Sequence, residues 1–106
     1  MLGSAQASFA GELVNKVIID FSEIPNWPAP SVQGHAGKLI IGEAAGVPVT
    51  LVSGRVHLYE GWTPQQVIFG VRVLGLLGLK RLILTNAAGG INPAYKPGLL
   101  VLITDH

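Results

Sequence analysis

Short apolar runs, rich in β-branched residues and bounded by glycine or proline, are the feature that most constrains this chain. Runs of this kind are typical of β-strands, because branched side chains pack well on a pleated surface. The second and third runs are separated only by a few small residues, which predicts a β-hairpin. The pattern predicts strands at residues 17–21, 38–42, 47–52, 81–85 and 99–104.

One longer helix is predicted from Pro64 to about residue 77. Thr63 precedes Pro64, which is the pattern of a capping residue followed by proline at the first helical position. Gly78 follows the last apolar residues and is expected to end the helix in a left-handed conformation. Arg72 is the only charged residue of this segment, so we expect the helix to be buried on several sides.

The order of these elements favours an α/β fold with a mixed β-sheet and flanking helices. A short helix is also expected within residues 3–14, capped by Ser4 or Ser8. The chain has 106 residues, a length that suits one small domain, and no repeat or linker divides it. We therefore treat residues 1–106 as a single domain.

The amino-acid composition limits the classes of protein to which this chain can belong. Hydrophobic residues make up 49% of the chain and charged residues 12%, with a formal net charge of +1. Such a balance excludes a disordered chain and argues against an electrostatic nucleic-acid binder. No apolar segment reaches the roughly 18 residues that a transmembrane helix needs, and no signal peptide is visible, so no membrane partner is expected.

Two further expectations follow from composition. The chain contains no cysteine, so it has neither disulfides nor thiolate metal ligands, and a reducing, cytoplasmic location fits. Few charges are available to cover the surface of so small a protein. Because large exposed apolar patches usually become interfaces, we expect a homo-oligomer, with exchange of segments between copies as one route to it.

The first segment whose side chains could form a binding or catalytic site is Arg55-Val-His57-Leu-Tyr59-Glu60. Alternation places Arg55, His57 and Tyr59 on one side of an extended chain. An arginine fork with a neighbouring histidine can bind phosphate oxygens, and a tyrosine beside them can order a sugar. The alternative is the polar face of an edge strand, with Glu60 pairing Arg55, and the residues alone favour neither interpretation.

The second segment is Thr-Asn-Ala-Ala-Gly-Gly at residues 85–90. It follows an apolar run expected to be a buried strand, which is where open α/β sheets place their ligands. Small side chains let the backbone N–H groups approach an anion. The alternative is an ordinary turn between a strand and a loop.

Ser4 and His35 are weaker candidates. Ser4 lies in a Gly-Ser turn before the expected short helix, and His35 lies in a Gly-His-Ala-Gly loop. Both could contact an anion. The local sequence favours a helix cap at a frayed terminus for Ser4, and a structural loop histidine explains His35 at least as well. No spacing typical of metal ligands and no carboxylate pair for acid–base catalysis is visible, so no metal and no certain catalytic residue is predicted.

Taken together, these segments resemble the trimeric purine nucleoside phosphorylase family. Several motifs occur in the family's order, which makes the resemblance specific. They lie at residues 2–4, 21–26, 34–37, 54–61, 85–90, 92–93 and 105–106. The resemblance implies a partial nucleoside-phosphorylase-like fold and phosphorolysis of purine nucleosides to free base and ribose 1-phosphate.

The resemblance also implies roles for individual residues. Inorganic phosphate is the co-substrate in this family, and no cofactor is expected. Tyr59 would face the ribose. Asn86, Ala88 and Gly89 would line the pocket between phosphate, sugar and base. Phosphate would be bound by Ser4, His35, Arg55, His57 and the backbone of Ala87.

The sequence departs from the family in two ways. Ala5, Gln6 and Ala7 follow Ser4 where the family has a glycine-rich loop, and side chains there resist positive φ. The matched motifs belong to the family's first half, whereas the residues that grip the purine belong to the second. The alternative function is therefore a catalytically inactive, truncated or engineered fragment that folds by self-association and at most binds phosphate.

Overall fold

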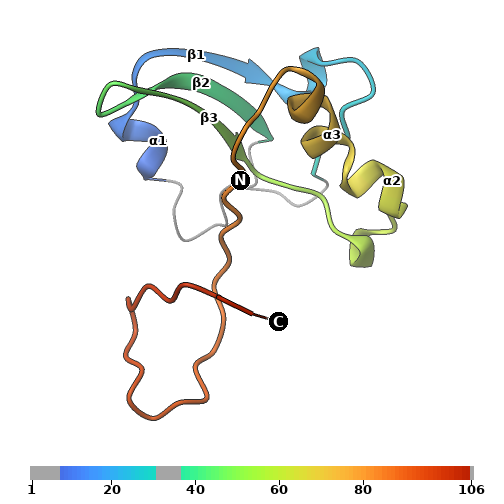
Figure 1. The fold of residues 1–106 in the computed structure, drawn as a ribbon. Helices are drawn as coiled ribbons and strands as arrows, with labels where there is room; N and C mark the ends of the chain where they lie inside the picture. The colour runs from blue at the N-terminus through green and yellow to red at the C-terminus, as the bar shows by residue number, and fades with distance from the viewer. Residues whose placement is uncertain (1–7, 31–36, 106) are drawn as a thin grey trace.

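The computed structural model describes residues 8–30 and 37–105. Its centre is a three-stranded antiparallel sheet in the order β1-β2-β3, built from β1 (Val14–Asp20), β2 (Lys38–Ala44) and β3 (Val47–Ser53) (Figure 1). Each strand neighbours the next one in the sequence. Over the described residues the sheet is antiparallel throughout, where the sequence predicted a mixed one.

The predicted β2–β3 hairpin is confirmed, and its turn is tight. The pair Ala44↔Val47 closes the ladder, which leaves two residues in the loop. Ala45 has φ 49° and Gly46 has φ 76°. Positive φ at both central residues is the geometry of a type I′ turn, whose twist matches that of the flanking strands.

Strand β1 is longer than predicted and is irregular. It begins at Val14 instead of residue 17, and its register with β2 shifts between Val14 and Val17. Asn15 lies within this shift with φ 51°, a conformation that asparagine tolerates better than most residues. The strand ends at Asp20, and Phe21 begins the 3-10 turn η2 (Phe21–Glu23).

Both faces of the sheet carry apolar clusters, because successive residues of a strand point to opposite faces. On one face, Leu39 and its partner Val52 pack with Phe21, Trp27 and Leu74. On the other face, the next pair in the ladder packs with the short helix α1 (Phe9–Glu12); this cluster is Leu13, Ile40 and Leu51, with Ala10 against it.

The segment predicted as one helix forms two, α2 (Pro64–Val67) and α3 (Phe69–Leu76), which meet at Ile68. The predicted cap is confirmed, since the Gln66 N–H donates to Thr63 Oγ1 at 3.3 Å. Gly78 has φ 95° and follows the last turn as predicted. The Gly78 N–H donates to the Gly75 carbonyl at 3.1 Å, which closes the helix end.

The expectation that this helical segment is buried on several sides was wrong. Only Gly70 and Leu74 of α3 are buried, and α2 has no buried residue. Leu76 is 91% exposed. Helix α3 packs on the sheet along one stripe, and no second layer of the described chain covers its other side.

The strands predicted at residues 81–85 and 99–104 do not form. Residues 79–105 run as an irregular segment that leaves the sheet and loops away from it (Figure 1). Ile83 is 75% exposed and Leu102 is 87% exposed. A strand is stabilised by pairing within a sheet and by burial of its side chains, and neither segment joins the described sheet.

Candidate functional site

The chain that leaves β3 brings Arg55 and His57 together. Gly54 turns the backbone with φ 94°, and Val56 is buried at 4% exposure. Burial of Val56 leaves its two neighbours on the opposite side of the extended chain. The Arg55 Nε–H donates to His57 Nε2 at 3.1 Å, so the side chains that alternation predicted to share a side are in contact.

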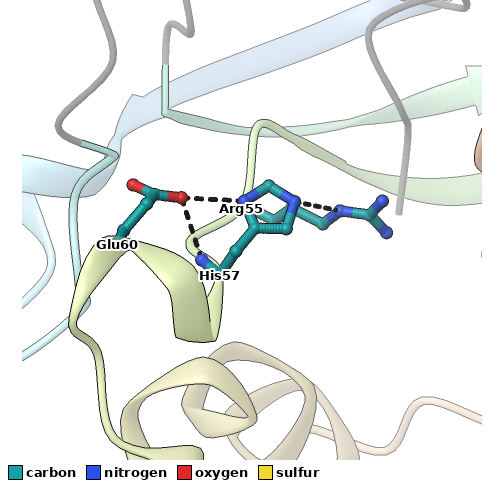
Figure 2. A network of polar contacts seen from close by, with 3 residues as sticks. All are labelled: Arg55, His57 and Glu60. Carbon is teal, nitrogen blue, oxygen red and sulfur yellow. Dashed lines mark hydrogen bonds and ion pairs between the residues drawn. The ribbon is translucent and has the colours of Figure 1, made fainter.

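Glu60 holds the other side of the imidazole. Its Oε1 accepts the backbone N–H of His57 at 2.9 Å and lies 2.7 Å from His57 Nδ1 (Figure 2). The Glu60 side chain is only 5% exposed, whereas that of His57 is 31% exposed. The turn η3 (Leu58–Glu60) places the carboxylate there, because its first residue follows His57 directly.

Glu60 is the site residue that sequence reasoning missed as a partner of His57. A signal for it exists in the spacing. A glutamate three positions after the residue that precedes a helical turn commonly reaches back to that residue's backbone N–H, as in a capping box. His57 and Glu60 have this spacing and this contact.

Tyr59 lies against the imidazole face. The rings of His57 and Tyr59 are stacked, with centroids 4.8 Å apart and planes 16° apart. Tyr59 is 81% exposed. One side of its ring therefore supports His57, while most of its surface remains available to a ligand.

The remaining predicted site residues fall into two groups. Ser4 and His35 lie outside the described residues. Asn86, Ala87, Ala88 and Gly89 lie exposed in the irregular segment 79–105, which loops away from the sheet (Figure 1). Their assignment to a phosphate and nucleoside pocket stays a prediction.

A small, open depression adjoins the cluster at Arg55. Trp27, Val52 and Gly70 contribute to its wall, but His57 and Tyr59 do not. No grouping of acidic and histidine side chains suited to a metal ion occurs in residues 8–30 and 37–105. Within those ranges, no helix is long and apolar enough to span a membrane.

The cluster can therefore bind and orient an anion. Arg55 supplies a guanidinium whose terminal nitrogens point away from the imidazole (Figure 2). His57 is held on one edge by Glu60 and on one face by Tyr59. Planar guanidinium groups recognise phosphate and carboxylate oxygens, and a neighbouring fixed imidazole adds direction to that recognition.

Comparison of the sequence with curated proteins gives relatives that are purine nucleoside phosphorylases. Purine nucleoside phosphorylase 1 of Geobacillus stearothermophilus is 45% identical over 106 residues, which are 100% of this chain and 39% of the relative. The mouse enzyme is 45% identical over 104 residues, covering 98% of this chain and 36% of the relative. The chain thus spans under two-fifths of the length of these relatives.

Solved structures give the same result. A Schistosoma purine nucleoside phosphorylase in complex with hypoxanthine matches with a TM-score of 0.79 and 40% identity, over 89% of this chain and 32% of that one. A purine nucleoside phosphorylase in complex with ribose 1-phosphate matches with a TM-score of 0.80 and 41% identity, over 89% of this chain and 34% of that one.

These matches confirm both the predicted resemblance and the partial phosphorylase-like α/β fold. The model of the phosphorylase superfamily matches residues 4–106. This match includes β1, β2, β3 and the Arg55–His57–Glu60 cluster that follows them. The chain therefore belongs to the phosphorylase superfamily.

Proposed function

We propose that this chain provides the phosphate-binding and ribose-facing part of a purine nucleoside phosphorylase. The observation that carries the proposal is the cluster of Arg55, His57 and Glu60, with Tyr59 stacked on the imidazole. The cluster occurs in a chain whose 106 residues are, over the whole length of this chain, 45% identical to a purine nucleoside phosphorylase. A structural relative is described in complex with ribose 1-phosphate, the sugar product of that reaction.

In the proposed reaction, a phosphate oxygen forms a bond to the anomeric carbon of the ribose as the bond to the purine nitrogen breaks. The bonding electrons leave with the base, which takes up a proton. The products are the free purine and ribose 1-phosphate. Phosphate is the only co-substrate, and the proposal requires no cofactor.

The residues of the cluster would act by positioning the phosphate and the ribose. Arg55 would hold the phosphate dianion and balance its charge, and His57 would fix its orientation. The exposed face of Tyr59 would pack against the ribose. Holding the nucleophile in line with the anomeric carbon, and stabilising charge there, are the main sources of rate enhancement for such a displacement.

A second candidate function is binding without turnover. Two observations favour it: residues 86–89 lie in the exposed, irregular segment that loops away from the sheet, and the chain spans 39% of the Geobacillus relative. Binding phosphate equally in the ground and transition states gives little acceleration. On this alternative the chain is a fragment that folds and binds phosphate but releases no base.

The experiment is phosphate-dependent release of hypoxanthine from inosine by the purified chain, measured together with the melting temperature in phosphate. We expect phosphate to raise the melting temperature of the wild type, and Arg55→Ala or His57→Ala to abolish the rise. Arg81→Ala removes an exposed arginine outside the cluster, and this variant should keep the phosphate-dependent rise in melting temperature. Base release that disappears in both cluster variants supports catalysis, and a phosphate response without base release supports binding alone.

A wild type that melts at the same temperature with and without phosphate would contradict both candidates. The phosphate concentration should exceed the dissociation constant by a wide margin, because the stabilisation grows with the logarithm of that ratio. The two cluster variants should be compared with the wild type in the absence of phosphate first, so that any loss of folding is separated from loss of binding.

We further propose that copies of this chain associate through residues 79–105. Large apolar side chains of this segment are exposed, among them Ile91, Leu100 and Leu102. Exposed large apolar side chains in such number are typical of interfaces. A cytoplasmic location, expected from the absence of cysteine, also stays a prediction.

A further inference from the structure

Strand β1 forms one edge of the described sheet, where it neighbours only β2. Val17 and Ile18 of this strand are both at least half exposed. Because they are consecutive, their side chains lie on opposite faces of the sheet. The other edge strand, β3, has buried Leu51 and Val52, and Pro48 there has no N–H to donate. The edge that is apolar and exposed on both faces is therefore that of β1.

Residues 99–104 have the composition of a strand that is covered on both faces. Their sequence is Leu-Leu-Val-Leu-Ile-Thr, and such continuous apolar runs are typical of strands with no side towards solvent. All five apolar side chains are more than half exposed. The run joins no strand of the described sheet and lies in the segment that loops away from it (Figure 1). The molecule thus has an exposed sheet edge and a separate apolar run suited to cover it.

Charge favours contact between these two surfaces in different copies. Residues 9–44, which hold α1, β1 and β2, carry four carboxylates and two lysines, a net charge of −2. Residues 79–105 carry three basic residues and one carboxylate, a net charge of +2. Opposite charges favour the approach of the two surfaces, whereas two β1 edges would oppose like charges. The partner that suits the β1 edge is therefore the apolar run of a second copy.

Charges at the ends of the two stretches set their relative direction. Strand β1 has Lys16 near its start and Asp20 at its end. Asp105 follows the apolar run. Lys96 stays close to the other end of the run, because the Leu99 N–H donates to the Lys96 carbonyl at 3.1 Å and closes a turn. Opposite charges meet at both ends of an antiparallel pair, whereas like charges would meet at both ends of a parallel one, which is destabilising.

The register follows from the same arrangement. Strand β1 pairs regularly with β2 from Val17 to Asp20. Placing the end of the apolar run at the start of this regular part sets Ile103 opposite Val17. The next pair, Leu102 opposite Ile18, then lies on the other face. Side chains directly opposite each other in an antiparallel pair are in contact, so the run covers both exposed faces of β1.

We propose that residues 99–104 of one copy add to the sheet of another copy as a fourth strand, antiparallel to β1. This pairing rests on the association through residues 79–105 proposed above, and it adds where the segment binds and in which direction. The backbone N–H and C=O groups of the two strands pair across the interface. In a two-fold dimer, each copy gives its apolar run to the partner and receives the partner's, so both β1 edges are covered.

Cysteine cross-linking tests the pairing, because the chain has no cysteine of its own. Copies with Val17→Cys are mixed with copies carrying either Ile103→Cys or Leu99→Cys, and the disulfides formed on mild oxidation are identified by intact mass. A disulfide needs Cα atoms within about 7 Å, and residues 99 and 103 of one strand lie roughly 13 Å apart. We expect a mixed disulfide with Ile103→Cys and its loss with Leu99→Cys.

The outcomes of this experiment separate the pairing from the association. Gln65→Cys, at an exposed position outside both stretches, gives the background of random collisions. A mixed disulfide with Leu99→Cys alone would mean parallel pairing, and Val17→Cys copies linked only to each other would mean contact between two β1 edges. Either result, or no disulfide above background in an associated sample, would overturn the pairing alone. A monomeric wild type in sedimentation velocity would overturn both the pairing and the association.

Lys96→Glu tests the direction through the sign of its effect. Antiparallel pairing places this residue near Asp20, so association should become about two- to fivefold weaker, the loss of an exposed ion pair. Parallel pairing would place it near Lys16 and strengthen association. The matched control, Lys80→Glu, makes the same change at an exposed position away from the run and should have a smaller effect at physiological salt, where distant charges are screened. Equal effects of the two variants, or tighter association of Lys96→Glu, would overturn the proposed direction.

Hydrogen exchange tests the edge without any variant. Peptides that cover β1 and residues 99–104 should exchange more slowly as the protein concentration rises through the range of association, because backbone amides of both stretches gain partners. Peptides that cover β3 are the internal control and should exchange at a constant rate. Slowing in β3 without slowing in β1 would overturn the proposal, even if a cysteine variant failed to fold.

Discussion

Ala45 occupies a backbone conformation that its side chain disfavours. It has φ 49° in the exposed two-residue turn between β2 and β3, followed by Gly46 with φ 76°. For a residue with a Cβ, the left-handed region costs roughly 1–2 kcal/mol. Asparagine and glycine occupy it at lower cost, and Asn-Gly is the preferred pair for this turn type. A single side chain therefore lowers the stability of the hairpin.

Ala45→Asn should stabilise the chain by about 1 kcal/mol and raise the melting temperature by about 4–8 °C. Ala45→Val should lower the melting temperature, because a β-branched side chain fits positive φ worst. Both are measured by thermal unfolding followed by circular dichroism. If the asparagine and valine variants melt at the same temperature, strain at this turn does not limit stability.

Helix α3 is held on the sheet by an aromatic contact that requires a glycine. Trp27 packs against Phe21 with ring centroids 5.0 Å apart and meets Phe69 edge-on at 6.0 Å. A Cβ at Gly70 would lie 2.5 Å from Trp27 Cζ2, which is closer than atoms can approach. The missing side chain at Gly70 thus sets how closely the helix approaches the indole.

Gly70→Ala should therefore destabilise the chain, although alanine is the better helix former. Alanine gains about 1 kcal/mol in a helix interior, and overpacking a core costs about 1–3 kcal/mol. Gly75→Ala, on the same helix with no atom within 4 Å of its Cβ, should raise the melting temperature. Urea unfolding of the two variants measures the difference. Stabilisation by both would show that Trp27 moves aside freely.

The parts of the fold that the sequence predicts are those set by neighbouring residues. The hairpin turn at residues 45–46, the Thr63 cap and the Gly78 helix end depend on contacts a few positions apart, and all three are confirmed. The strands at residues 81–85 and 99–104 depend on partners elsewhere, which composition does not reveal. The break at Ile68 lies between the apolar residues Val67 and Phe69, where no residue signals it.

The site shows the same division. The alternation of Arg55 and His57 across a buried Val56 places both side chains together, as the period of an extended chain requires. The resemblance to the phosphorylases supplies roles for these residues. The hydrogen bond between Glu60 and His57 depends on the turn η3. The sequence alone shows only that the two residues are three positions apart.

At the scale of the whole molecule, apolar surface is unevenly distributed. The sheet, α1 and α3 bury their clusters, whereas residues 79–105 expose most of their large apolar side chains. Leu100 is 83% exposed and Leu102 is 87% exposed. Exposed apolar surface of this kind lowers solubility unless another surface covers it. We propose that a second copy of the chain covers residues 79–105.

Leu100→Lys combined with Leu102→Lys should shift the chain towards a monomer, because two like charges oppose burial of the segment. Sedimentation velocity over a micromolar concentration series measures the shift. The control, Ser22→Lys combined with Gln65→Lys, adds the same charge at exposed positions outside the segment and should leave association unchanged. A monomeric wild type would contradict the proposed association.

The antiparallel meander also has a consequence for the order in which this fold is acquired. All three strands lie between Val14 and Ser53, each pairing with the next. Pairing between sequence neighbours closes short loops, which is fast and needs no distant segment. During synthesis, the sheet can therefore assemble before the apolar segment at residues 79–105 leaves the ribosome. When that segment emerges from the ribosome, it would therefore be attached to a sheet that is already folded.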